Sequence, residues 1–276
     1  MGIVNVTPDS FSDGGQFYGF EQALSQARRL IGEGAHLLDI GGESTRPGAA
    51  EVSVGDEIRR VIPLVEALEA ECAAAGVPIS VDTSKPEVMR AALAAGASVI
   101  NDVRALQAPG ALEAVAGADA HDCGVVLMHM QGTPRTMQQD PHYDDVLAEV
   151  NGFLRARCKA LVDAGVAPER VAVDPGFGFG KRAAHNLALL AHLDRLQVDG
   201  APILVGLSRK STLGQITNRA VDQRIHASVA AALIAVQRGA GIVRVHDVAA
   251  TRDALAVWQA VRAEDQRQDN HEREIP

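Results

Sequence analysis

The sequence predicts a single α/β domain folded as a closed (β/α)8 barrel (TIM barrel), and three observations support this. Eight short, nearly continuous apolar runs recur along the 276 residues. Segments with the period of amphipathic helices separate the runs, and neither a linker nor an internal repeat divides the chain. Eight parallel strands joined by right-handed helical crossovers close most economically into a barrel. A doubly wound open sheet is the structural alternative.

Each apolar run is predicted to be a strand buried on both faces, because a barrel strand lies between an inner core and an outer layer of helices. In chain order the expected strands are Gly2–Val6, Leu37–Gly41, Ile79–Asp82, Ser98–Asp102, Gly124–His129, Val171–Asp174, Ile203–Ser208 and Ile242–Asp247.

Helix starts and stops between the strands are marked by local residues. Ser53 is expected to begin the helix after the second strand, and the sequence Ser84-Lys85-Pro86-Glu87 indicates a capping box before the next helix. Glycine ends many helices because it adopts the left-handed conformation readily. The expected stops are Gly76, Gly96, Gly165 and Gly241. Residues 1–262 form the barrel in this interpretation, and the polar residues 263–276 are predicted to be a disordered tail.

Composition excludes several classes of protein. The net charge of −9 and the lack of a Lys/Arg cluster argue against a nucleic-acid partner. No apolar run is long enough to cross a bilayer, so no membrane partner is expected. Without a secretory signal, the cytoplasm is the expected location. Cys72, Cys123 and Cys158 lack the spacing of a metal site and are expected to be buried, reduced thiols.

Polar side chains recur where the expected strands end, which is the face on which barrel enzymes place their sites. A buried strand has no use for such a group unless the group is paired, because burying it alone is costly. Capping of single strands by a polar residue is common, but it explains the whole set poorly. The set is Asn5, Asp39, Asp82, Asn101, Asp174, Ser208–Lys210, Arg244 and His246.

Two kinds of ligand fit these residues. Asp82, Asn101 and Asp174 suit a planar, donor-rich heterocycle, because a carboxylate accepts two parallel hydrogen bonds from an amino group and an adjacent ring N–H. Metal binding by the carboxylates is the competing idea, although no known metal motif accompanies them. Arg244 and His246 project from the same side of one expected strand. Together with Arg46 and Lys210 they predict a cationic pocket for phosphate or carboxylate groups.

Loops after the strands complete the predicted site. The glycine-rich segment 176–181 lacks the spacing of a phosphate loop or a dinucleotide fold, and it is expected to bring Phe179 toward a flat ligand. Residues Thr7–Gly15 and Gly42–Gly48 are candidate lids. An ordinary loop would use glycine as well, and static loops are the alternative.

Read together, these motifs resemble dihydropteroate synthase. The resemblance rests on residues 1–15 (MGIVNVTPDSFSDGG), 39–48 (DIGGESTRPG), 81–86 (VDTSKP), 101–102 (ND), 128–134 (MHMQGTP), 174–181 (DPGFGFGK), 208–211 (SRKS) and 244–247 (RVHD). It covers essentially the whole chain in order. The family is a homodimeric TIM barrel, a transferase of folate biosynthesis and the target of sulfonamides. It condenses 6-hydroxymethyl-7,8-dihydropterin pyrophosphate with 4-aminobenzoate and releases pyrophosphate.

The resemblance implies roles for named residues. The pterin would be held by Asp82, Asn101, Met128, Asp174 and Lys210. The pyrophosphate would be held by Asn5, Thr45, Arg46, Arg244 and His246, with Asn5 acting partly through Mg²⁺ as the cofactor. The 4-aminobenzoate site would be lined by Thr45, Pro47, Phe179, Lys210 and Ser211, with the loop that carries Phe11 folding across it.

Two departures from the family and two alternatives accompany this interpretation. The family usually has a hairpin before the first strand, and an aromatic often follows the SRKS motif where this chain has Thr212. The main alternative is a pterin-binding methyltransferase domain, which shares the barrel and the pterin grip but needs no pyrophosphate pocket. The other alternative is a non-catalytic pterin-binding barrel. The apolar segment Ala227–Val236 is a candidate dimer surface, although shielding the barrel would explain it equally well.

Overall fold

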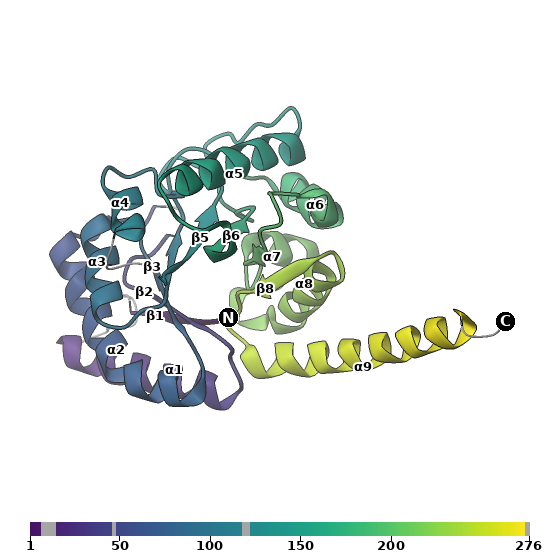
Figure 1. Ribbon diagram of the computed structural model, residues 1–276, viewed down its shortest axis with the longest axis horizontal. Helices are drawn as coiled ribbons and strands as arrows, with labels where there is room; N and C mark the ends of the chain where they lie inside the picture. Colours follow the sequence, from purple (N-terminus) through teal and green to yellow (C-terminus); the bar gives the residue numbers. More distant parts are fainter. Residues whose placement is uncertain (7–14, 46–47, 118–121, 274–276) are drawn as a thin grey trace.

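The computed structural model describes residues 1–6, 15–45, 48–117 and 122–273, which form a ring of eight parallel strands surrounded by helices (Figure 1). The strands follow one another round the ring in chain order. Beyond the last strand, the amide of Val245 donates to the carbonyl of Met1 over 2.9 Å, and the amide of Ile3 donates to the carbonyl of Val245 over 3.1 Å. These bonds close the ring, so the predicted barrel is confirmed over a doubly wound sheet.

The strands are β1 Gly2–Asn5, β2 Leu38–Gly41, β3 Ile79–Asp82, β4 Val99–Asp102, β5 Gly124–Met128, β6 Val171–Asp174, β7 Ile203–Val205 and β8 Ala240–Val243. The helices are α1 Gly15–Gly32, α2 Val54–Ala75, α3 Pro86–Ala94, α4 Ala111–Ala116, α5 Val146–Asp163, α6 Ala183–Ala191, α7 Ser211–Thr217, α8 Ile225–Gln237 and α9 Val248–Arg273. Short 3₁₀ helices span Pro168–Arg170, Leu193–Arg195 and Val221–Gln223.

Six of the eight strands lie within one residue of their predicted bounds, and the last two differ more. The ladder between β7 and β8 shifts register between Ile203 and Leu204, and both strands end early. β7 stops at Val205, and β8 begins at Ala240 and stops at Val243. The prediction that Arg244 and His246 lie within a strand is therefore wrong, and both residues follow β8 directly.

The predicted helix boundaries hold in part. Ser53 begins α2 as expected, and its hydroxyl accepts a hydrogen bond from the amide of Asp56. The capping box at Ser84 is wrong: Lys85 is the residue before α3, and the Ser84 hydroxyl donates to the buried carboxylate of Asp102 instead. Gly241 lies within β8, and the chain turns after α8 at Gly239, whose φ is +98°.

Alternate strand residues face the helices and the interior of the ring, as the two-residue period of a strand requires. Outward-facing residues such as Val4, Ile40 and Val81 belong to the main hydrophobic core between strands and helices. Val126, Ala172 and Leu204 form a second, smaller cluster. They occupy the opposite face of their strands, and so fill the interior of the ring.

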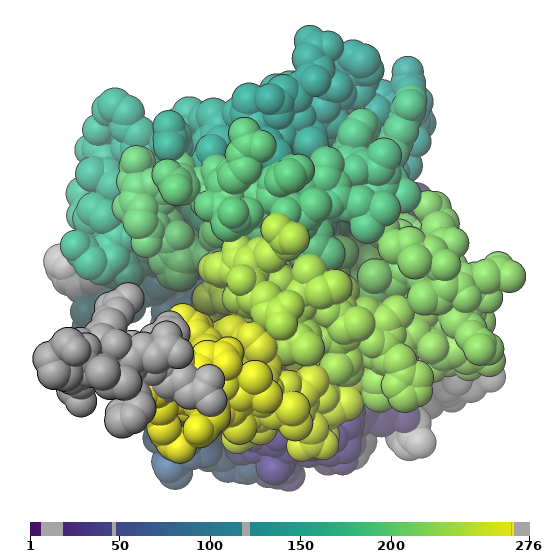
Figure 2. All heavy atoms as spheres, turned by 90° about the vertical axis from the view of Figure 1, so that its right-hand side faces the viewer, coloured from purple at the N-terminus to yellow at the C-terminus, as the bar shows by residue number. Residues whose placement is uncertain are grey.

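Of the two C-terminal helices, α8 packs against the barrel and α9 extends into the predicted tail. α8 buries Ser228, Ala231, Ala232 and Ala235, so the predicted apolar segment shields the barrel on that side. α9 continues through residues 263–273, where the sequence predicted a disordered tail, and it projects beyond the barrel (Figure 1). Figure 2 views the molecule from the side toward which α9 points. No glycine or proline interrupts this stretch, and an ion pair between Arg267 and Glu264 lies on its surface.

Two features predicted from composition concern the cysteines and the apolar character of the helices. Cys72, Cys123 and Cys158 are free and buried, as predicted. Within the described ranges, no helix combines the length and the apolar character that a membrane span needs.

Candidate active site

Three polar side chains stand at one level on β1, β3 and β4 at the mouth of the barrel. The mouth comprises the carboxyl ends of the strands and the loops after them. Strand register pairs Asn5 with Gly41, Gly41 with Asp82, and Asp82 with Asn101. A Cβ atom at Gly41 would lie 4.0 Å from Asn5 Oδ1 and 3.9 Å from Asp82 Oδ2. Because glycine stands between them, no side chain of β2 separates the two oxygen atoms at this level.

Arg244 reaches across the barrel to this group. Its Nε donates to Asp39 Oδ2 over 2.5 Å and one Nη donates to Asp82 Oδ2 over 3.1 Å. Asp39 is fully buried and also accepts from Ser80 Oγ at 2.6 Å and from Asn101 Nδ2 at 3.3 Å. No ligand was predicted for Asp39 from the sequence. A carboxylate within an apolar strand does, however, indicate a group that is buried and paired with another side chain. The Arg244 charge, predicted to serve an anion pocket, is balanced here by two carboxylates.

The opposite side of the mouth gathers the residues after β5, β6 and β7. Met128 pairs in register with Asp174, whose Oδ1 accepts from the amide of Gly176 at 2.7 Å. Lys210 Nζ donates to the carbonyl of Phe177 and lies 4.5 Å from the centre of the Phe179 ring. The predicted pterin and 4-aminobenzoate residues of this side therefore adjoin one another.

A single glycine connects the two sides of the mouth. A Cβ atom at Gly206, just after β7, would lie 4.0 Å from Lys210 Nζ and 4.0 Å from Arg244 Cβ. Lys210 and Arg244 therefore both approach Gly206, and the charges of Asp82 and Asp174 act on Lys210 from the other strands. The carboxylates of the predicted ring clamp and the Arg244 cation therefore lie together at the mouth, close enough to shift one another's pKa.

Burial shifts the pKa values of the titratable side chains at the mouth. It raises the pKa of Asp82 to about 7, with the nearby Arg244 guanidinium opposing the shift. It also raises the pKa of Asp174, against the opposing charge of Lys210. Burial lowers the pKa of Lys210 to about 8, although Asp174 favours its charged form. The pKa values of these acids and of this base are thus shifted toward neutral pH, which is typical of functional sites.

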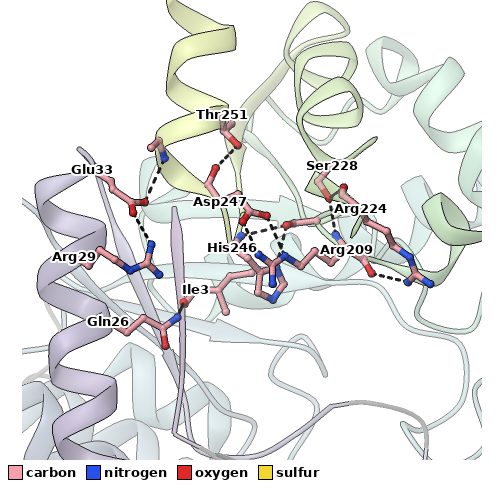
Figure 3. Close-up of polar contacts among 12 residues, drawn as sticks. Ile3, Gln26, Arg29, Glu33, Arg209, Arg224, Ser228, His246, Asp247 and Thr251 are labelled. Carbon is pink, nitrogen blue, oxygen red and sulfur yellow. Dashed lines mark hydrogen bonds and ion pairs between the residues drawn. The ribbon is translucent and has the colours of Figure 1, made fainter. Parts of the chain in front are cut away.

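The turn after β7 is held by residues outside the mouth (Figure 3). Arg209 has φ of +59°, its guanidinium pairs with Asp247 at 2.5 and 3.0 Å, and its amide donates to Ser228 Oγ. His246 Nδ1 lies 2.9 Å from Ser208 Oγ, so it is tied to the same turn. Ser211 is the exposed first residue of α7.

The loop between β2 and α2 is fastened by a cluster that the sequence did not reveal. Glu43 accepts from the amide of Val52 at 3.0 Å and from Lys85 Nζ at 2.5 Å. Lys85 also pairs with the fully buried Glu57 at 2.5 Å. Thr45 of this loop is half-buried. Arg46, Pro47 and the segment with Phe11 lie outside the described residues, so their predicted roles stay predictions.

Comparison with known proteins identifies the relatives of this barrel. Residues 1–246 match the family described as pterin binding enzyme. The dihydropteroate synthase of Escherichia coli strain K12 is 52% identical over 260 residues, covering 94% of this chain and 90% of that protein. The chain belongs to the dihydropteroate synthase family. The family membership expected from the sequence motifs is confirmed.

Solved structures of the dihydropteroate synthase family superimpose closely on the chain. The Xanthomonas albilineans enzyme with 4-aminobenzoic acid is 59% identical at a TM-score of 0.88, covering 95% of this chain and 92% of that one. The Burkholderia cenocepacia enzyme complexed with 7,8-dihydropteroate is 55% identical at a TM-score of 0.86, with 97% and 92% covered. The fold of the family is therefore that of this barrel.

One departure from the dihydropteroate synthase family has a structural account. Thr212 stands where an aromatic often follows the SRKS motif, and it is buried. Its Oγ1 accepts from Asn186 Nδ2 at 2.9 Å, while Asn186 Oδ1 accepts from the amide of Gly178 at 2.9 Å. Thr212 thus helps to hold the glycine-rich loop through Asn186.

Proposed function

We propose that the mouth of the barrel condenses 6-hydroxymethyl-7,8-dihydropterin pyrophosphate with 4-aminobenzoate, giving 7,8-dihydropteroate and pyrophosphate in folate biosynthesis. The chain is an enzyme of the transferase class by its relatives. The observation that carries the proposal is that Lys210 and Arg244 both approach Gly206 and interact electrostatically with Asp82 and Asp174. Groups that recognise a ring and groups that attract an anion therefore adjoin one another. Sulfonamide recognition is expected at the same site, and a relative has been solved with such a drug.

The pterin ring would lie between the strand-borne carboxylates. Asp82 and Asp174 supply acceptors for ring N–H and amino groups, and Asn101 adds a donor and an acceptor. Asn101 is already oriented by Asp39. Lys210 would donate to the ring, and the buried Met128 would contact its face. Because Asn101 and Asp174 are buried, their hydrogen bonds to a ligand form in a low-dielectric surrounding.

The pyrophosphate would bind beside the ring, at Asn5, Thr45, Arg46, Arg244 and His246. The described residues contain no group of three His, Cys, Asp or Glu placed to hold a metal. Mg²⁺ commonly keeps several waters and binds one or two protein oxygens together with substrate phosphates. Asn5 Oδ1, which faces the space beside Asp82, fits such an ion. When bound, Mg²⁺ would neutralise charge on the leaving group.

The 4-aminobenzoate would bind on the other side of the mouth, at Thr45, Pro47, Phe179, Lys210 and Ser211. Phe179 offers an aromatic face, and Lys210 lies over that ring. The ammonium group of Lys210 and the hydroxyl of Ser211 would attract the carboxylate or orient the ring. The same lysine would thus contact both substrates.

The reaction breaks the bond between the pterin methylene carbon and the pyrophosphate oxygen. The electron pair of that bond leaves with pyrophosphate. Asn5, Arg244, His246 and Lys210 would stabilise the developing negative charge. The Asp82 carboxylate would stabilise the positive charge that spreads into the pterin ring. The neutral arylamine then attacks the methylene carbon and loses a proton. A weak nucleophile suffices, so no strong base is required, and exclusion of water protects the cation.

The assembly is proposed to be a homodimer. Several large apolar side chains on α7, α8, α9 and the 3₁₀ turn before α8 are exposed, and apolar side chains of this kind are what a subunit interface would cover. These residues are Ile216, Val221, Ile234, Val257 and Val261. Sedimentation at micromolar concentration tests the proposal, because a monomer would contradict it. The cytoplasmic location stays a prediction from the sequence.

A pyrophosphate-release assay with both substrates tests the function. The expected result is release that depends on 4-aminobenzoate and yields 7,8-dihydropteroate. Ligand binding without release would instead favour a pterin-binding methyltransferase domain or a non-catalytic barrel. Repeating the assay after chelation, and again with added Mg²⁺, tests the proposed ion, since release that is indifferent to both would contradict it.

A further inference from the structure

The glycine-rich loop after β6 is held by side chains at every one of its carbonyl groups from residue 176 to residue 180. None of these five carbonyls belongs to a strand ladder. The carbonyls of Gly176 and Phe179 accept hydrogen bonds from Lys181 Nζ at 3.0 and 3.1 Å. The carbonyl of Phe177 accepts from Lys210 Nζ, and the carbonyl of Gly178 accepts from Gln138 Nε2 at 2.7 Å. The carbonyl of Gly180 accepts from the Tyr143 hydroxyl at 2.8 Å. The loop conformation therefore depends on side-chain donors rather than on backbone pairing with a neighbouring strand.

Lys181 supplies two of these five hydrogen bonds, and only 3% of its surface is exposed. Its Nζ also lies 2.9 Å from His129 Nδ1 and 3.3 Å from the His129 carbonyl. One amino group thus joins both ends of the loop to the residue that follows β5. Both substrates would approach this loop from the mouth, whereas Lys181 holds it from within the core.

His129 is adapted to this arrangement. Burial, together with the charge of Lys181, lowers the pKa of His129 to about 3, so its ring stays neutral and Nδ1 can accept a hydrogen bond. The His129 ring packs edge-on against Phe153, with 5.0 Å between centroids. The acceptor is therefore fixed in place by packing, and Lys181 has a rigid anchor.

We propose that Lys181 is a positioning residue for the 4-aminobenzoate site, fixing from the core the loop that presents Phe179 to the substrate. The inference rests on the proposed function, because it takes Phe179 as a contact of 4-aminobenzoate. Lys181 touches neither substrate. Its effect passes mainly through the carbonyls of Gly176 and Phe179, and Asp82 and Asn101, which strand register positions, do not share it. Among the pterin residues, Asp174 feels the charge of Lys181, which opposes the rise in its pKa that burial causes.

The test replaces Lys181 with methionine, which keeps the length and burial of the side chain but removes its donors. Lys181→Met should raise KM for 4-aminobenzoate by ~10-fold or more, since two hydrogen bonds to the loop are lost. KM for the pterin pyrophosphate should rise by a clearly smaller factor, because strand register positions Asp82 and Asn101, and Asp174 loses only the nearby charge of Lys181. Hydrogen exchange of peptides covering residues 175–181 should accelerate without substrate, while β5 exchanges as in the wild type.

Two further variants keep the outcome decisive. Lys181→Gln retains N–H donors on a shorter side chain and should show a smaller rise in the same KM, and it decides the matter if Lys181→Met does not fold. Lys159→Met, at an exposed lysine of α5, is the matched control and should change neither KM. Equal changes in both KM values, or an unchanged KM for 4-aminobenzoate in a folded variant, would overturn the proposal.

Failure of the underlying function can be told apart from failure of this inference. Should the wild type neither bind 4-aminobenzoate in calorimetry nor release pyrophosphate, the proposed function fails. Should the wild type do both while the Lys181 variants keep the wild-type KM and the wild-type exchange of residues 175–181, only the positioning role is refuted.

Discussion

The two halves of the barrel mouth are built by different means. On β1, β3 and β4, strand register sets Asn5, Asp82 and Asn101 at one level, and the backbone ladder positions them. After β6 and β7, loops carry Phe179 and Lys210, and side-chain donors position those loops. In the first half a substitution should alter mainly the contact it removes. In the second half, residues that touch no substrate should also alter binding.

Arg244 joins the two halves, so its removal should have the largest effect. Arg244→Met leaves the fully buried Asp39 without its ionic partner. Breaking a buried pair by removing one partner is costly, and we expect the free energy of unfolding to fall by ~3 kcal/mol. Urea unfolding of the wild type and the variant measures this loss.

The matched control for this variant is Arg209→Met, which also removes an arginine that pairs with an aspartate near the mouth. The Arg209 side chain is 36% exposed and its partner Asp247 is 14% exposed, so water reaches this pair. Loss of the Arg209 charge should therefore cost about 1 kcal/mol or less. Equal losses of unfolding free energy in the two variants would contradict the idea that burial of the carboxylate sets the cost.

Substitution of a substrate contact in each half sharpens the comparison. Asp82→Ala and Lys210→Ala should each lower turnover by ~100-fold or more, the scale of losing one preorganised group that stabilises charge. Asp82→Ala should raise KM for the pterin substrate alone, while Lys210→Ala should raise KM for both substrates. Pyrophosphate release measures both, with Asp163→Ala at an exposed position as the control. Near-normal turnover in either variant would refute its assigned role.

The smallest predicted effect is a pH dependence of the unfolding free energy, which arises from Lys181 in the half of the mouth that is built from loops. Burial lowers the pKa of Lys181 from 10.5 to about 7, so between these values the unfolded chain binds a proton that the folded chain does not. The cost of burying this group is therefore greatest below about pH 7, and it fades as the pH rises toward 10.5. The unfolding free energy of the wild type, measured relative to that of Lys181→Met, should rise from neutral toward alkaline pH. Parallel curves in urea unfolding would contradict this.

The sequence was most informative where one residue pattern determines one structure. The apolar runs predicted the barrel, and polar residues at the strand ends predicted that Asp82, Asn101 and Asp174 would converge at its mouth. Parallel strands place their carboxyl ends together, so position along the chain was enough. The same reasoning failed at β8, where the register shifts and the strand ends at Val243, so that Arg244 and His246 follow it.

The sequence was least informative where a contact depends on side chains from distant segments. Nothing local to Lys181 indicates that it folds back to His129, and nothing local to Lys85 indicates its pairing with Glu43 and Glu57. Likewise, Arg244 suggested a free cation, because its two carboxylate partners lie 205 and 162 residues away. Such pairings emerge only from the closed ring.

A crystal structure of the chain with a pterin pyrophosphate analogue and 4-aminobenzoate tests the central claim most directly. The account predicts that the ring contacts Asp82, Asn101 and Asp174 while the phosphates contact Asn5 and Arg244 in the same cavity. A ring bound away from both carboxylates, or phosphates bound outside the mouth, would contradict it.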